Sequence, residues 1–127
     1  FAALEHPRVM ELHKLAVCCE GLGRTREALD ALDRARTAPG EYPPRPLCMQ
    51  LCDVVEMRLR NPDYLRDPDY GAALMDVFNR CRRELPIGYA AFHLPRVLEW
   101  LTAGRQYKQA YELLRDFPIK LPNLTIE

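Results

Sequence analysis

The sequence lacks an excess of charge of either sign, a long apolar run and a leader-like beginning. Its 18 basic and 18 acidic residues cancel, which removes the long-range attraction typical of proteins that bind nucleic acid or anionic membranes. No apolar stretch approaches the roughly 18 residues needed to span a bilayer. No signal-peptide pattern opens the chain. We therefore expect no membrane partner and an intracellular location, in the cytoplasm or the nucleus.

Motifs of catalysis and metal binding are also lacking. The five cysteines are an odd number, which fits reduced thiols better than a disulfide framework. Cys48 and Cys52 are one helical turn apart, and Cys81 with a histidine would complete a tetrahedral metal site, but no further pair has ligand spacing. No oxyanion-hole loop or nucleophile elbow is present. We predict no enzyme activity, no catalytic residues, no metal and no cofactor.

What is present is enough apolar material for one domain. The chain has 127 residues, of which 48% are hydrophobic, and a single modest core fits that size. It begins at Phe1 and stops abruptly at Glu127. We expect one helical domain over residues 1–127 that is a piece of a longer protein.

Apolar residues recur at spacings of three and four, which indicates helices and no strands. Short polar links or prolines separate the predicted helices, which cover residues 9–22, 25–37, 46–59, 70–84, 89–102 and 107–117. The links predict antiparallel hairpins at about 8–38, 46–86 and 89–117, with an inserted loop at 61–69. Asp69 is expected to cap the fourth helix. Pro95 predicts that the fifth helix either starts near Leu94 or kinks.

The first and third hairpins contain an internal repeat. Positions in the first hairpin are Leu12, Leu15, Ala16, Cys19, Ala28, Leu32 and Gly40. At one constant offset they match Leu94, Val97, Leu98, Leu101, Ala110, Leu114 and Pro122. The turns match nearly as well, with Gly23-Arg24 against Gly104-Arg105. The middle copy is degenerate.

This pattern resembles the tetratricopeptide repeat, a helical hairpin with a period of about 34 residues and a small residue where its two helices cross. Ala28, Ala73 and Ala110 occupy that crossing position. The resemblance implies an all-α fold of three antiparallel hairpins stacked as a short right-handed α-solenoid. It also implies a scaffold that binds a peptide or helix of another protein through the concave face formed by the first helix of each hairpin.

The resemblance places a mixture of apolar and charged side chains on that face. The candidate binding residues are Met10, His13, Val17, Glu20, Met49, Cys52, Asp53, Glu56, Phe92, His93, Arg96 and Glu99.

Three other interpretations remain open. The pentatricopeptide repeat is a close competitor, carried by residues 103–114 and 118–125, and it implies an RNA-binding module. Arg80, Arg82 and Arg83 are the candidate phosphate contacts, unless they form only a solvated helix end. Tyr64 and Tyr70 make the loop at 61–69 a second candidate binding site. A purely structural segment, or one that forms a homo-oligomer through its end hairpins, is the remaining alternative.

Overall fold

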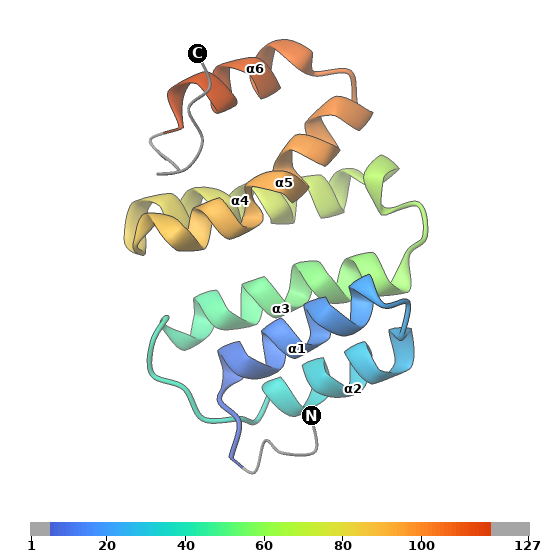
Figure 1. Cartoon of the computed structure of the whole chain (residues 1–127), viewed down its shortest axis with the longest axis vertical. Helices are drawn as coiled ribbons and strands as arrows, with labels where there is room; N and C mark the ends of the chain where they lie inside the picture. Colours follow the sequence, from blue (N-terminus) through green and yellow to red (C-terminus); the bar gives the residue numbers. More distant parts are fainter. Residues whose placement is uncertain (1–5, 118–127) are drawn as a thin grey trace. The chain divides into compact units, whose positions relative to one another are not determined.

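In the computed structural model, which describes residues 6–117, the chain is all-α, as predicted (Figure 1). Within that range there are six α-helices, one short 3-10 helix and no strand. The helices are α1 (Val9–Gly21), α2 (Thr25–Ala35), α3 (Arg45–Arg60), α4 (Pro68–Glu84), α5 (Ile87–Ala103) and α6 (Tyr107–Asp116), with the 3-10 helix η1 at Tyr64–Arg66. The repeat position Pro122 and the segment 118–125 lie outside the described residues.

The chain divides into two compact units. The first ends at Val77, inside α4, and the second begins at Phe78. Stacking of all three hairpins in one solenoid therefore remains a prediction, and each unit is described by itself.

Three helices build the core of the first unit. The helices α1 and α2 pack along each other, and α3 packs against both (Figure 1). The core residues they share are small or medium in size, which lets the helix backbones approach closely. They are Val9, Leu12, Ala16, Cys19, Ala28, Ala31, Leu32, Ala35, Ala38, Cys48, Cys52 and Val55. The buried Ala28 is consistent with its expected place at the crossing of α1 and α2.

The helix α3 also pairs with the first half of α4, and two hydrogen bonds give the direction of that pairing. Gln50, early in α3, donates to Asp76 at 3.1 Å, while Arg58, late in α3, donates to Tyr70 at 3.4 Å. The early part of one helix therefore meets the later part of the other. This part of the second hairpin is antiparallel, as predicted.

In the second unit, α5 packs against α6. The helix α5 does not start at Leu94, because it runs from Ile87 through Pro95. A proline inside a helix removes one backbone hydrogen bond and favours a bend, and Figure 1 shows α5 changing direction along its length. At the other side of this unit, the Phe78 and Phe117 rings stack at 6.0 Å.

The loop between α3 and α4 is shorter than predicted. The helix α4 begins at Pro68, and Asp67 rather than Asp69 acts at its start, because Asp67 Oδ1 accepts the N–H of Asp69 at 2.9 Å. Proline suits the first turn of a helix, where its missing N–H costs nothing. Asn61 Oδ1 accepts the N–H of Asp63 at 2.9 Å at the other end of the loop.

The turns of the first and last hairpins have the same backbone geometry. Gly23 has a φ of 74° and Arg105 a φ of 59°, both in the left-handed region. The next residue in each turn, Arg24 or Gln106, donates its N–H to a helix carbonyl five residues back, at 2.8 Å in both cases. This is the pattern that commonly ends a helix with a left-handed residue.

This geometry corrects the match between the two turns. Gly23 corresponds to Arg105 and not to Gly104, whose φ is −86°. The turn therefore follows the same constant offset as the helices on either side of it. The internal repeat is present in the backbone and not only in the apolar spacing.

Two glycine substitutions at the end of α1 should have opposite effects. Gly23→Ala should lower the free energy of unfolding by about 1 kcal/mol, because a left-handed φ strains any residue with a Cβ. Gly21→Ala, in the last turn of α1, should raise it by about 0.5–1 kcal/mol, because alanine favours the helix and a Cβ there meets nothing within 4 Å. Urea unfolding followed by circular dichroism measures both, and equal effects would contradict the turn geometry.

Candidate functional site

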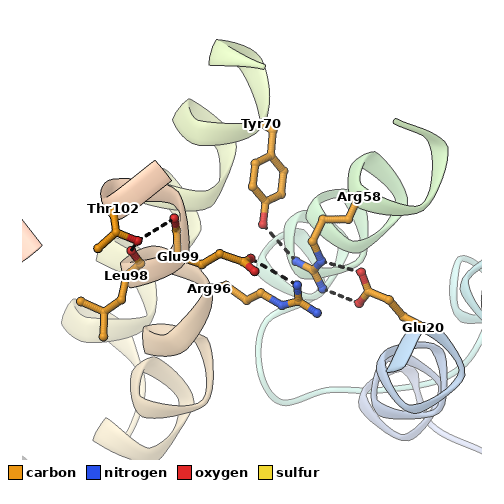
Figure 2. Close-up of polar contacts among 7 residues, drawn as sticks. All are labelled: Glu20, Arg58, Tyr70, Arg96, Leu98, Glu99 and Thr102. Atoms are coloured by element: carbon orange, nitrogen blue, oxygen red, sulfur yellow. Dashed lines mark hydrogen bonds and ion pairs between the residues drawn. The ribbon is translucent and has the colours of Figure 1, made fainter. Parts of the chain in front are cut away.

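A buried ion pair connects α1, α3 and α4. Arg58 on α3 donates from Nε and Nη2 to both carboxylate oxygens of Glu20 on α1, at 2.8 and 2.9 Å. Its Nη1 donates to the hydroxyl of Tyr70 on α4 (Figure 2). The Arg58 side chain is only 4% exposed and that of Glu20 13%. Bidentate geometry of this kind is among the stronger charged contacts in proteins.

The charge of Arg58 is retained in this environment. Burial alone lowers the pKa of Arg58, but the hydrogen bonds to Glu20 and the proximity of Tyr70 raise it, and the net pKa lies above the ordinary value. A buried guanidinium without these partners would carry a large desolvation cost. Arg58 therefore belongs to the buried interior of the first unit, and its guanidinium does not lie at the surface.

A second charged cluster lies where α2 ends against α3. Arg36 contacts Asp53 at 2.7 Å and Glu56 at 3.1 Å, and Glu56 also accepts from Arg60 at 3.1 Å. Burial alone raises the pKa of Glu56, but the hydrogen bonds from Arg60 and Arg36 hold it below the ordinary value. Glu56 thus stays ionised at neutral pH.

Beside this cluster the surface is hollowed. A depression of about 460 Å³ joins the C-terminal half of α3 to the loop that follows. Its lining residues are Asp53, Glu56, Met57, Arg60, Asn61 and Asp67. It therefore brings together two candidate sites that the sequence suggested separately, the first-helix face and the loop at 61–69.

The loop side of this acidic depression is held in place by side-chain hydrogen bonds. Asp67 Oδ2 accepts from the Asn61 amide at 3.4 Å, while its Oδ1 accepts the N–H of Asp69. With Asp53 and Glu56 on the helix side, three carboxylates line the opening. Arg36 pairs with Asp53 and Glu56, and Arg60 pairs with Glu56, so the carboxylates outnumber the guanidinium groups by one. The arrangement favours cationic groups.

Several predicted first-helix binding residues lie inside the first unit instead of on an open face. His13 and Cys52 are buried. Glu20 is bound to Arg58, and Met10, Val17 and Met49 are half-buried against the core. Asp53 and Glu56 line the depression described above.

The reason is that α1 and α3 each contact more than one neighbour. A helix with neighbours on two sides buries side chains on both of them, whereas the apolar spacing of its sequence indicates only one buried face. The buried residues of α3 include Leu47, Cys48, Leu51, Cys52 and Val54. The expectation that Cys52 lies on an open binding face was therefore wrong.

The candidate residues on α5 are divided between surface and interior. Phe92 and Glu99 are exposed, and Arg96 is half-buried and forms an ion pair with Glu99 at 3.4 Å (Figure 2). His93 is buried, in line with Ala90 and Val97, so it does not belong to an exposed binding face.

Two of the three candidate arginines near the end of α4 have partners within the protein. Arg80 forms an ion pair with Glu84 at 3.2 Å, and the Arg82 guanidinium lies 5.6 Å from the ring centres of both Phe78 and Phe117. Arg83 is exposed. Ion pairing and cation–π contacts account for two of the three residues.

The two loop tyrosines have different roles. Tyr70 is fully buried in α4, and its hydroxyl accepts from Arg58. Tyr64, in η1, is half-buried and meets the Tyr70 ring edge-on at 5.1 Å. Tyr70 is a core residue, so the prediction of a tyrosine site on the loop was wrong for it.

Four of the five cysteines are buried, and only Cys18 is exposed. The Cys48 thiol donates to the Pro43 carbonyl at 3.2 Å. Within residues 6–117, no three histidine, cysteine or acidic side chains gather as a metal site. Burial raises the pKa of Cys52 and of Cys81 to about 11, and it also raises the pKa of Cys19 and Cys48.

Comparisons with models of protein families, with curated protein sequences and with solved structures gave no match to this chain. The tetratricopeptide resemblance therefore stays a prediction that rests on the internal repeat. Within the part of the chain that is described, no helix is long and apolar enough to cross a membrane.

Removing one partner of the buried ion pair should be costly. Arg58→Met should lower the free energy of unfolding by about 3–5 kcal/mol, because it leaves the Glu20 carboxylate in a largely buried position without its guanidinium. The double variant Arg58→Met, Glu20→Leu should recover most of that loss. Arg60→Met is the control, since the Arg60 side chain is 63% exposed and its loss should cost about 0.5 kcal/mol or less. Additive losses in the double variant would refute the coupling.

Thiol reactivity should separate Cys18 from the rest. At mildly alkaline pH the folded protein should give one fast-reacting thiol with a disulfide reagent and four slow ones, because buried thiols with a raised pKa form little thiolate. Cys18→Ser should abolish the fast phase, whereas Cys52→Ser should leave it intact. A fast phase that survives Cys18→Ser would show that a buried thiol is open to solvent.

Proposed function

We propose that this chain is a protein-interaction scaffold of tetratricopeptide-type hairpins, stacked as a short right-handed α-solenoid. In this proposal it binds an extended, basic segment of another protein in the acidic depression on α3 and the loop after it. The observation that carries the proposal is the junction of Asp53 and Glu56 with Asp67 around one opening.

The repeat architecture is supported by the turns as well as by the helices. Gly23 and Arg105 share a left-handed conformation at equivalent positions, with equivalent hydrogen bonds. Helical-hairpin repeats cannot bury their apolar faces singly and therefore stack. The stacking creates extended surfaces that suit peptides better than small molecules.

The depression has the chemistry of a site for lysine or arginine side chains. Asp67 is held by hydrogen bonds from both sides, so little order is lost when a cation binds. Asp53 is 57% exposed while paired with Arg36, which leaves part of its carboxylate accessible to a partner. Met57 supplies an apolar surface for the methylene stem of a long cationic side chain.

Selection from a random peptide library tests this proposal without a known partner. Immobilised protein should enrich peptides with spaced lysine and arginine residues, and the binding of an enriched peptide should weaken with added salt. Asp53→Asn with Asp67→Asn keeps the side-chain shapes and removes two charges. Binding of the enriched peptide should fall about tenfold, measured by fluorescence anisotropy.

The matched control is Asp33→Asn with Glu41→Gln, which removes the same charge from exposed positions of the first unit that do not line the depression. This variant should bind like the wild type. Equal losses in both variants would mean that net charge alone attracts the peptide. Tight binding of a homopolymeric RNA that peptide does not compete for would move the RNA-binding alternative to first place.

A further inference from the structure

The last helix has an apolar surface wider than its contact with α5. Tyr107, Tyr111 and Leu114 are spaced four and three residues apart, so they form one stripe along α6. Their side chains are exposed, with relative exposures of 61%, 64% and 56%. On the neighbouring face of the same helix, Ala110 is buried. The apolar surface of α6 therefore has a buried part at Ala110 and an exposed part formed by Tyr107, Tyr111 and Leu114.

The equivalent surface of the first hairpin is covered by a helix. By the repeat offset, Leu114 corresponds to Leu32 on α2, which is fully buried. The helix that follows the first hairpin, α3, packs against α1 and α2, with Cys48, Cys52 and Val55 in the same core cluster as Leu32. Leu32 is therefore buried together with residues of the helix that follows its hairpin.

Two cationic side chains lie along one edge of the exposed stripe. Lys108 and Arg115 are exposed and seven residues apart, so they lie along the same edge of α6. The Arg115 guanidinium lies 5.8 Å from the Tyr111 ring centre and forms an exposed ion pair with Asp116. On the first hairpin, a cation likewise meets the covering helix, where Arg36 binds Asp53 and Glu56 of α3.

We infer that the stripe formed by Tyr107, Tyr111 and Leu114 is a docking surface for an amphipathic helix of a partner protein, bound as α3 binds α1 and α2. Apolar residues of that helix, at spacings of four and three, pack on the stripe, and carboxylates along its edge face Lys108 and Arg115. The inference is independent of the acidic depression.

Charge argues against a second copy of this chain as the occupant. If two α6 helices packed antiparallel on their stripes, the same edge of each would meet, which would bring Lys108 and Arg115 of one copy close to those of the other. Like charges in such a contact oppose association. An acidic helix avoids this repulsion.

The probe is a peptide with the sequence of α3, residues 45–61, in which Arg45, Arg58 and Arg60 are replaced by glutamine, so that it keeps the apolar spacing and its charged side chains are the carboxylates of Asp53 and Glu56. Labelled and kept reduced, it should bind the intact chain in fluorescence anisotropy. Tyr111→Glu should weaken that binding about tenfold or more, because aromatic side chains at the centre of an interface carry much of the affinity. Leu22→Glu is the control, since Leu22 is 62% exposed on another helix end, and it should bind like the wild type.

A charge exchange sharpens the test. The chain with Lys108→Glu and Arg115→Glu should prefer a version of this peptide in which Asp53 and Glu56 are replaced by lysine, whereas the wild type should prefer the version that keeps both carboxylates. Loss of binding by one variant with no change of preference would overturn the charge complementarity. Absence of binding, or binding that Tyr111→Glu leaves unchanged, would overturn the docking surface. So would dimerisation of the wild type, seen by sedimentation and abolished by Tyr111→Glu.

Discussion

A pair of antiparallel helices has more apolar surface than the pair itself can cover, and this constraint organises the first unit. The helices α1 and α2 meet through small residues such as Ala16 and Ala28, which bring their backbones close but leave a shared apolar groove. The helix α3 fills that groove with Cys48, Cys52 and Val55. Since α3 also pairs with α4, it is buried on two sides, and the positions of its charged residues follow from that placement.

The buried Arg58 is the clearest consequence. A position enclosed by α1, α3 and α4 would ordinarily hold an apolar residue, and an ion pair there contributes little net stability over well-packed hydrophobic groups. Its geometry is directional, however, because the guanidinium reaches Glu20 and Tyr70 only when the three helices hold one register. We infer that the pair selects this register among the sliding arrangements that a core of small, similar residues would tolerate.

Periodicity and chain-breaking residues predicted the fold well because they are local. The all-α class follows from the spacing of apolar residues, and the approximate ends of the helices follow from the positions of glycine and proline. The side chains that face a second neighbour did not follow, because one stripe on a helix does not reveal how many helices surround it. His13 and Cys52 were placed on the binding face for that reason, and Tyr70 was assigned to the loop site, although all three are buried. The acidic depression was partly predictable, since Asp53, Glu56 and the loop were all candidates, but their meeting depends on how α3 ends.

The zero net charge of the chain conceals a local separation of charge that matters more for binding. Around the depression, the carboxylates of Asp53, Glu56 and Asp67 outnumber the guanidinium groups of Arg36 and Arg60 by one, while Lys108 and Arg115 lie along the edge of the α6 stripe. Fields from such patches decay within about 10 Å at moderate salt, so each acts on its own contact and neither attracts ligands from a distance. In the scaffold proposed above, partners are selected by the match of short-range charge to apolar spacing. The exposed stripe of Tyr107, Tyr111 and Leu114 is the surface proposed for such a match, and at the equivalent position of the first hairpin Leu32 is buried in the core that α3 shares.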